Sequence, residues 1–271
     1  MLARRVLRAL RHLAAAFGVL CVDSRLRFLA LRLGLGSGRG PVPLRLKALD
    51  GHALWVRPGT SDAMVVVEDF VHGFADPPAE VDRTGPMRMV ELGSNIGAGV
   101  AGLAHRYPEA SVLGVEADPG NAALARRNLA PWADRCRLVE AAVWEGPGRP
   151  VVDHRGGRES GYTVRSSNGS EAATAGEAGG GELRSLTVEE LLADFHPGEP
   201  IDYMYLDIEG THAQLLRGEA PWLDRVRAIK VSRHLETPYS EEDCARDLRR
   251  LGFRARVVPL EPTGWTIGIR E

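Results

Sequence analysis

A carboxylate followed by a glycine-rich loop stands near the middle of the chain, in the stretch MRMVELGSNIGAG from Met87 to Gly99. The apolar residues before the loop read as a buried parallel strand. The glycines after Glu91, at Gly93 and Gly97, let the backbone turn sharply into a helix, whose free N–H groups would face a ligand. An acid before such a loop repels a pyrophosphate but suits a cationic amino acid and a sulfonium. The stretch therefore favours S-adenosylmethionine over NAD or FAD.

A second acid strengthens this prediction. Glu116 ends the apolar run SVLGVE, 25 residues after Glu91. An acidic side chain at this strand tip of a nucleotide-binding unit can accept hydrogen bonds from both ribose hydroxyls. The third strand of the unit ends near Ala141, where backbone and side chains can reach an adenine. The predicted cofactor-binding residues are Glu91, Gly93, Ser94, Asn95, Gly97, Glu116, Ala117, Ala141, Ala142 and Asp207.

Further carboxylates follow the buried run IDYMYLDIEG, which ends in Asp207, Glu209 and Gly210. Carboxylates at a strand tip are costly unless they contact a cation, a hydroxyl or a helix N-terminus. The next apolar run, VRAIKVSRHLE, carries His234 and Glu236 near its end. A sulfonium methyl is already a strong electrophile, so the protein mainly has to position the nucleophile in line and take up the proton of an alcohol.

We predict Asp207, His234 and Glu236 as the catalytic residues. Asp207 would orient the acceptor hydroxyl or the amino group of the cofactor, and His234 would be the base, because a histidine can take up a proton at neutral pH. In an alternative, Asp207 and Glu236 hold a Mg²⁺ ion that lowers the pKa of the hydroxyl. His234 would be the weak ligand of that ion, since Mg²⁺ prefers oxygen.

Strands and helices alternate regularly around these residues. After the first strand, the pattern predicts helices over 100–107 and 120–130 and a second strand over 111–117. Thr187, with Glu190 three residues later, can cap a further helix. Such alternation implies an α/β fold with parallel βαβ units and right-handed crossovers. The last two runs, FRARVVP and GWTIGIRE, read as an antiparallel hairpin, which distinguishes a class I methyltransferase from a nicotinamide-binding Rossmann domain.

Two parts precede this unit. Residues 1–40 carry eight arginines and a single acid, Asp23. They predict a helical leader that packs on the domain, with a membrane-surface or substrate-gating role as the alternative. Residues 41–84 predict a small β element made of the strand-like runs PLRLKAL, ALWVRP and AMVVVEDFV, with a hairpin at Asp50-Gly51.

The remainder, residues 85–271, is expected to be the S-adenosylmethionine-binding domain. Phe70 and His72, at the end of the preceding β element, would lie near the entrance to the cofactor site. Residues 153–182 are poor in large apolar side chains and rich in Gly, Ser, Ala and Glu. A segment of this composition cannot bury enough surface to offset its ordering entropy, so we expect a flexible insertion.

The composition limits the protein class. The 271 residues are 44% apolar and carry a net charge of −2, which gives no general nucleic-acid footprint. Three scattered cysteines, Cys21, Cys136 and Cys244, argue against a disulfide framework or a structural zinc and for a reducing compartment. The uncharged part of the leader, 13–22, is too short to span a bilayer. We expect a cytoplasmic protein without nucleic acid as partner, and a homo-oligomer stays open.

The order of these blocks resembles the FkbM family of S-adenosylmethionine-dependent methyltransferases. The blocks are VELGSNIG, VEADPGNAALARRNL, SLTVEELL and IDYMYLDIEGTHAQLLRG, and the upstream VRPGTSD is similar to the lead-in of many members. The resemblance covers residues 44–256. It implies the seven-stranded sheet of a class I methyltransferase, and an enzyme that methylates a hydroxyl on a sugar or a secondary metabolite. By this resemblance, the cofactor loop of the family corresponds to Glu91, Gly93, Asn95 and Gly97, and the acid that binds the ribose corresponds to Glu116. The block after the fourth strand corresponds to Asp207, Glu209 and Gly210.

Two positions depart from the family pattern. The helix after Gly210 begins with His212, where an acid is usual and where we expect a solvated residue, and the glutamate near the fifth strand comes late, at Glu236. A non-catalytic relative that keeps the fold as a binding module is therefore an alternative. An NAD-linked oxidoreductase is disfavoured by Glu91, by the missing middle glycine and by the terminal hairpin. The acceptor, a small molecule or a glycan, is not specified by the sequence.

Overall fold

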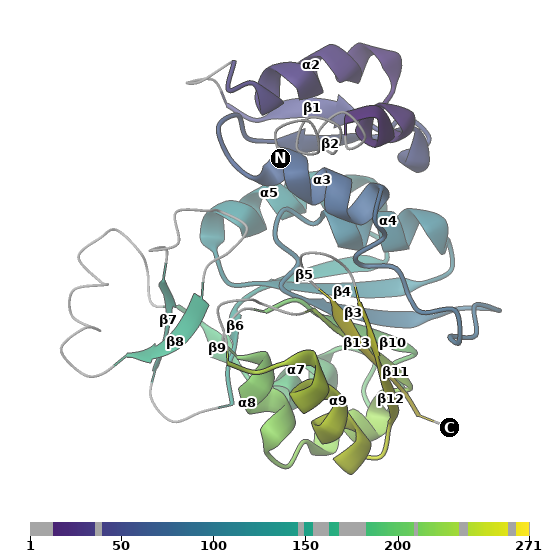
Figure 1. Cartoon of the computed structure of the whole chain (residues 1–271), viewed down its shortest axis with the longest axis vertical. Helices are drawn as coiled ribbons and strands as arrows, with labels where there is room; N and C mark the ends of the chain where they lie inside the picture. The colour runs from purple at the N-terminus through teal and green to yellow at the C-terminus, as the bar shows by residue number, and fades with distance from the viewer. Residues whose placement is uncertain are drawn as a thin grey trace.

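A twisted seven-stranded sheet forms the centre of the computed structural model, which describes residues 13–35, 40–145, 149–153, 163–167, 183–208, 211–232, 238–259 and 264–270 (Figure 1). The strands lie in the order β12-β13-β11-β10-β3-β4-β5. Their bounds are β3 Arg88–Leu92, β4 Ser111–Glu116, β5 Cys136–Glu140, β10 Tyr203–Leu206, β11 Ala228–Ser232, β12 Arg254–Val258 and β13 Trp265–Ile269.

Five neighbouring strands of the sheet, β5, β4, β3, β10 and β11, are parallel, and β13 runs antiparallel to both β11 and β12. The mostly parallel α/β sheet with a C-terminal antiparallel hairpin is thus confirmed. Its strand order is that of the class I methyltransferase fold. The chain adds β4 and β5 on one side of β3, and β10 and β11 on the other side. This reversal of strand order leaves a crevice at the carboxyl ends of β3, β4 and β10, where ligands bind in open α/β sheets.

Helices cover both faces of the sheet, as Figure 1 shows, with α3, α4 and α5 on one side and α7, α8 and α9 on the other. Their bounds are α3 Asp62–Phe70, α4 Ala98–Arg106, α5 Pro119–Leu129, α7 Val188–Asp194, α8 His212–Arg217 and α9 Glu241–Arg250. Alternate strand residues therefore face two separate apolar cores: Met89 lies in one, and its neighbour Val90 in the other. Burial on both faces is why the central strands are continuously apolar.

Shorter elements complete the chain. A helical turn at 13–19 and α2, Val22–Arg32, precede the ribbon of β1, Val42–Arg45, and β2, Ala53–Val56. The other short elements are η1 Lys47–Leu49, η2 Ala130–Trp132, η3 Pro221–Arg225, β6 Ala142–Val143, β7 Arg149–Asp153, β8 Thr163–Ser167 and β9 Ser185–Leu186. The strands β7 and β8 pair antiparallel. Part of the predicted insertion is thus a β-ribbon, while 154–162 and 168–182 lie outside the described residues.

Local signals in the sequence placed several boundaries correctly. Thr187 accepts a hydrogen bond from the Glu190 N–H, and the Glu190 carboxylate accepts one from the Thr187 N–H, which is the predicted cap of α7. Asp50 and Gly51 have φ angles of 49° and 82° in the turn that joins β1 to β2. These left-handed conformations are the ones that Asp-Gly adopts most readily in a hairpin.

The prediction of a third strand-like run, AMVVVEDFV, was wrong, because this segment forms α3. Val65, Val66 and Val67 all belong to one apolar core, and Val65 also lines a cavity. Phe70 lies against Gly102 of α4, where no side chain blocks the ring. Tertiary packing against α4 therefore overrides the strand preference of a valine run.

Polar side chains fasten the N-terminal ribbon to α5 and to the loop before α4. The Asp62 carboxylate is fully buried and accepts hydrogen bonds from the backbone N–H and the guanidinium of Arg57, which also donates to Asn121 of α5. Asn128 is likewise fully buried and contacts the backbone of both Trp55 and Ile96. These contacts hold β2 against α5, and the pairing of Arg57 with Asp62 connects both elements to the start of α3.

Replacement of Asn128 by leucine, which is similar in volume, should lower the free energy of unfolding by about 2–3 kcal/mol, because buried backbone groups lose their partners. The wild-type side chain accepts from the Trp55 N–H at 2.7 Å and donates to the Trp55 and Ile96 carbonyls at 3.1 and 2.8 Å. Urea denaturation measures the change. An unchanged midpoint would show that the hydrogen bonds of Asn128 do not stabilise the contact between β2 and α5.

Within the described part of the chain, no helix has both the length and the apolar character needed to cross a membrane.

Candidate functional site

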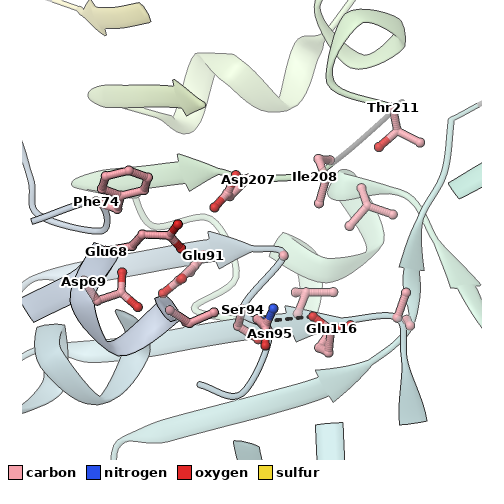
Figure 2. A pocket seen from close by; sticks show the side chains of 16 residues that line it. Glu68, Asp69, Phe74, Glu91, Ser94, Asn95, Glu116, Asp207, Ile208 and Thr211 are labelled. Atoms are coloured by element: carbon pink, nitrogen blue, oxygen red, sulfur yellow. Dashed lines mark hydrogen bonds between the residues drawn. The ribbon is translucent and has the colours of Figure 1, made fainter. Parts of the chain in front are cut away.

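A cavity lies at the carboxyl ends of β3, β4 and β10, and together with its mouth, which is open to solvent, it encloses about 840 Å³ of space outside the protein atoms (Figure 2). It is lined by Val65, Glu68, Asp69, Phe74, Glu91, Gly93, Ser94, Asn95, Val115, Glu116, Ala117, Ala141, Val143, Asp207, Ile208 and Thr211. Eight of the predicted site residues line it: Glu91, Gly93, Ser94, Asn95, Glu116, Ala117, Ala141 and Asp207. The crevice that the strand order creates thus coincides with the acids and the glycine loop.

The loop between β3 and α4 joins three strand ends. The N–H groups of Gly93 and Ser94 both donate to the Val115 carbonyl at 2.9 Å, and the Asp207 N–H donates to Leu92 at 2.8 Å. Gly93 has a φ of 89°, and a Cβ built on it would lie 2.2 Å from the Asp207 carbonyl oxygen. Only glycine allows this approach, so Gly93 brings the ends of β3 and β10 together.

Glu91 lies beneath this loop with only 4% of its surface exposed. One of its carboxylate oxygens, Oε2, and the hydroxyl of Ser94 have no hydrogen-bond partner among the described residues. Burial raises the pKa of Glu91 well above its usual range, and the nearby carboxylates of Asp69, Asp207 and Glu116 raise it further. An unpartnered carboxylate in a buried site is costly, and a cationic ligand would remove that cost.

Glu116 occupies the other side of the loop. Its two oxygens accept hydrogen bonds from the N–H groups of Asn95 and Asp118, each at 2.8 Å. Burial raises the pKa of Glu116 to about 7, although these two backbone donors act in the opposite direction. Asn95 has a φ of 47°, which points its N–H back at the carboxylate. Glu116, the acid that the sequence predicts to bind a ribose, therefore lies beside the glycine-rich loop.

Asp207 follows β10 and lines the cavity, where its charge acts on Glu68 and Glu91 (Figure 2). Its Oδ2 accepts a hydrogen bond from the hydroxyl of Tyr205 at 3.2 Å, and its backbone N–H continues the pairing with β3. Two other predicted cofactor residues do not line the cavity. Gly97 caps α4 with a φ of 77° and packs against Ala125, and Ala142 belongs to β6, where its N–H donates to the Arg184 carbonyl.

Two acids that the sequence reasoning missed, Glu68 and Asp69, line the cavity from α3. Burial, followed by the charge of Asp207, raises the pKa of Glu68 to about 7. Burial and the neighbouring carboxylates, Glu68 first, raise the pKa of Asp69 well above its usual range. A helical interpretation of the run AMVVVEDFV would have identified these two acids, because Val65, Glu68 and Asp69 share one face of a helix.

The structure corrects the expected position of His212 and adds an aromatic residue, Phe74, to the cavity wall. Phe70 and His72 do not line the cavity; Phe74, a few residues later, does. His212 is buried, with 2% of its surface exposed, and its Nδ1 lies 3.1 Å from the Ile208 carbonyl oxygen. It is therefore not the solvated residue expected from the sequence.

The predicted residues Glu209, Gly210, His234 and Glu236 lie outside the described residues. The geometry of a base or a magnesium site at these positions therefore stays a prediction. Among the residues that the structure describes, no group of three or more His, Cys, Asp or Glu side chains is arranged to hold a metal ion.

No family model matches the chain. A trans-aconitate 2-methyltransferase from Methylobacterium nodulans is 46% identical to it over 55 residues, which are 20% of this chain. The match spans 21% of that relative's length.

Solved structures that the chain resembles include a precorrin-6y C5,15-methyltransferase from Geobacter metallireducens, with a TM-score of 0.44 and 12% identity over 70% of this chain and 83% of that one. The mitomycin 7-O-methyltransferase MmcR has a TM-score of 0.43 and 14% identity over 78% and 55% of the two chains. The pyocyanin biosynthetic protein PhzM has a TM-score of 0.41 and 15% identity over 76% and 57%.

Proposed function

We propose that the protein is an S-adenosylmethionine-dependent methyltransferase. The observation that carries the proposal is the buried Glu91 carboxylate, with an unpartnered oxygen, in a cavity at the carboxyl ends of β3, β4 and β10. The Ser94 hydroxyl beside it also lacks a partner among the described residues. A ligand that is both cationic and rich in hydrogen-bonding groups satisfies both atoms. None of the described lining residues is a lysine, arginine or histidine that would favour a phosphate instead.

The lining residues fit the parts of this cofactor. Glu91 and Asp207 would hold its ammonium group, and Glu116 would accept hydrogen bonds from the ribose hydroxyls. The small apolar wall of Ala117, Ala141 and Val143 would border the adenine. When bound, the cofactor supplies a methyl group on a positively charged sulfur, which becomes neutral when the methyl group is transferred.

The proposed acceptor group is a hydroxyl on a sugar or a secondary metabolite, as the resemblance to the FkbM family implies. Asp207 supports this assignment because it lies at the cavity wall, where it can orient the hydroxyl. We retain His234 as the proposed base for the hydroxyl proton. Membership of the FkbM family, and the division into a leader, a β element and a catalytic domain at residues 40 and 84, are parts of the same proposal.

Calorimetric titration with S-adenosylhomocysteine and with NAD tests the cofactor assignment. We expect a dissociation constant in the micromolar range, about −8 kcal/mol, for the former and no binding of the latter. Transfer of labelled methyl groups from S-adenosylmethionine to candidate sugars and metabolites then tests activity. Binding of NAD alone would replace the proposal with an oxidoreductase. Binding of S-adenosylhomocysteine without transfer to any acceptor would favour the non-catalytic binding module.

Affinity for S-adenosylhomocysteine should increase with pH. The pKa of Glu116 is raised to about 7 by burial, so a large fraction of this group is protonated below neutrality. Since the ribose hydroxyls donate to the carboxylate form, binding requires loss of that proton, and the affinity should be about tenfold higher at pH 8 than at pH 6. Calorimetry at the two pH values measures this ratio.

Glu116→Gln provides the control for this pH dependence. The variant should bind S-adenosylhomocysteine more weakly and with a smaller difference between pH 6 and pH 8, because glutamine does not titrate. An unchanged pH dependence in this variant would assign the effect to another carboxyl group.

A further inference from the structure

The cavity contains more acids than the proposed cofactor uses. Five carboxylates line it: Glu68, Asp69, Glu91, Glu116 and Asp207. The cofactor carries two positive centres, its ammonium and its sulfonium, together with one carboxylate. The acids at the strand ends, Glu91, Glu116 and Asp207, already account for the ammonium and the ribose. Glu68 and Asp69 come from a different element, α3, and have no assigned role.

The acids follow one another along the cavity. Figure 2 shows Asn95 and Glu116 at one end, Glu68 and Asp69 at the other, and Glu91 between them. The pKa shifts agree with this order. The charges of Asp69 and Glu116 both raise the pKa of Glu91. The carboxylates that raise the pKa of Asp69 are Glu68, Asp207 and Asp76, and Glu116 is not among them. If the adenosine half lies at Glu116, the α3 end is beyond the reacting methyl group, where an acceptor must enter.

The charge of Lys230 lowers the pKa of Asp69, but burial and the neighbouring carboxylates have the larger, opposite effect. Lys230 is buried, and its ammonium donates to the backbone carbonyls of Gly73, Phe74 and Asp76 at 3.1, 2.5 and 3.3 Å. These three hydrogen bonds use all three of its hydrogens. Among the described residues, the side chains of Glu68 and Asp69 make no hydrogen bond or ion pair. The unpartnered Oε2 of the buried Glu91 lies in the same cavity.

An aromatic ring completes this end of the cavity. Phe74 lines it beside Glu68 and Asp69, and its ring meets that of Trp265 edge to face, with centroids 5.3 Å apart. Two carboxylates beside a fixed aromatic ring provide both kinds of contact that an alkylammonium group prefers, namely charged hydrogen bonds and a cation–π contact. A neutral sugar hydroxyl would leave at least one of these half-buried carboxylates without a charged partner.

We propose that Glu68, Asp69 and Phe74 form the acceptor subsite of the proposed methyltransferase and that this subsite selects an acceptor carrying a protonated amino group. This inference rests on the proposed function and narrows it to aminated sugars or metabolites. The amino group is held at the α3 wall, and the hydroxyl to be methylated faces Asp207. The Glu68 and Asp69 side chains act by binding, and they take no part in methyl transfer.

Matched pairs of small probes test the subsite on the full chain saturated with S-adenosylhomocysteine. The pairs are glucosamine and glucose, tyramine and tyrosol, and ethanolamine and ethylene glycol, in which an amine replaces a hydroxyl. Ligand-detected NMR titration at pH 7 gives their dissociation constants. We expect the amine to bind more tightly by about tenfold, 1.4 kcal/mol, in at least one pair. The preference should fall to threefold or less in Glu68→Gln and in Asp69→Asn.

Glu109→Gln is the matched control, because Glu109 is exposed and does not line the cavity. It should keep the wild-type preference for amines. If S-adenosylhomocysteine binds but no pair shows a preference, the subsite proposal is wrong and the proposed function stands. If the Glu68 or Asp69 variants lose more than tenfold in S-adenosylhomocysteine affinity, these acids bind the cofactor and the subsite is again rejected. Absence of S-adenosylhomocysteine binding to the wild-type protein would instead overturn the proposed function.

Discussion

Replacement of Glu91 by glutamine should weaken S-adenosylhomocysteine binding by about 10- to 150-fold, the equivalent of the 1.5–3 kcal/mol typical of a charged hydrogen bond. The carboxylate is 4% exposed, and its Oε2 has no partner among the described residues, so a bound ammonium would be its main source of stabilisation. Glutamine keeps the shape but loses the charge. Calorimetry on the two proteins at pH 7.5 measures the difference.

The same substitution should stabilise the unliganded protein. Burial raises the pKa of Glu91 in the folded state, so the neutral carboxyl is the better-tolerated form. The folded wild type therefore loses stability as the pH rises through that raised pKa, and the glutamine variant does not. We expect the variant to gain about 1–3 kcal/mol over the wild type at high pH. Urea denaturation at pH 5.5 and 8.5 should show a gap that widens with pH.

Glu109→Gln again serves as the control for Glu91, since it removes an exposed carboxylate of the same kind. It should change neither the affinity for S-adenosylhomocysteine nor the pH dependence of unfolding. A Glu91 variant that is less stable and binds as tightly as the wild type would show that this carboxylate supports the fold and not the ligand.

Replacement of Gly93 by alanine should destabilise the fold by about 3–5 kcal/mol, at the upper end of the range for single substitutions. The new Cβ would lie 2.2 Å from the Asp207 carbonyl oxygen and 2.8 Å from its carbon, both backbone atoms that cannot rotate away. Separation of β3 from β10 would break the pairing of the Asp207 N–H with Leu92 and widen the cavity. Urea denaturation and S-adenosylhomocysteine titration should both show the loss.

Gly198→Ala separates the two reasons for this loss. Gly198 has a φ of 77°, close to the 89° of Gly93, but no atom lies within 4 Å of its built Cβ. Its alanine variant should lose only the conformational part, about 1 kcal/mol. Equal losses at the two positions would mean that the left-handed backbone, and not the contact with Asp207, makes glycine necessary at Gly93.

Short-range patterns were reliable where a residue and its neighbours in sequence decide the outcome. The capping pair Thr187 and Glu190 fixed the start of α7, and Asp50-Gly51 marked a turn, because each feature closes its hydrogen bonds within a few residues. The loop after Glu91 was recognised for the same reason. Alternating strands and helices then leave few possible topologies, which is why the parallel sheet and its terminal hairpin followed from the order of the runs.

Long-range packing decided what these patterns did not contain. The valine run of α3 favours a strand by itself and becomes a helix because Val66, Val67 and Phe70 pack on the domain. That choice places Glu68 and Asp69 in the cavity.

The sequence by itself determined the class of sheet, the acid-and-glycine loop and the second acid, Glu116, because these depend on apolar runs and on local turn chemistry. Only the tertiary structure decided which acids share one cavity and which of them lack a partner. Burial and charge neighbours are properties of residues brought together from distant parts of the chain, such as Asp69, Glu91 and Asp207. Spacing along the chain gives no measure of the distances between such residues, and these distances set the chemistry of the site.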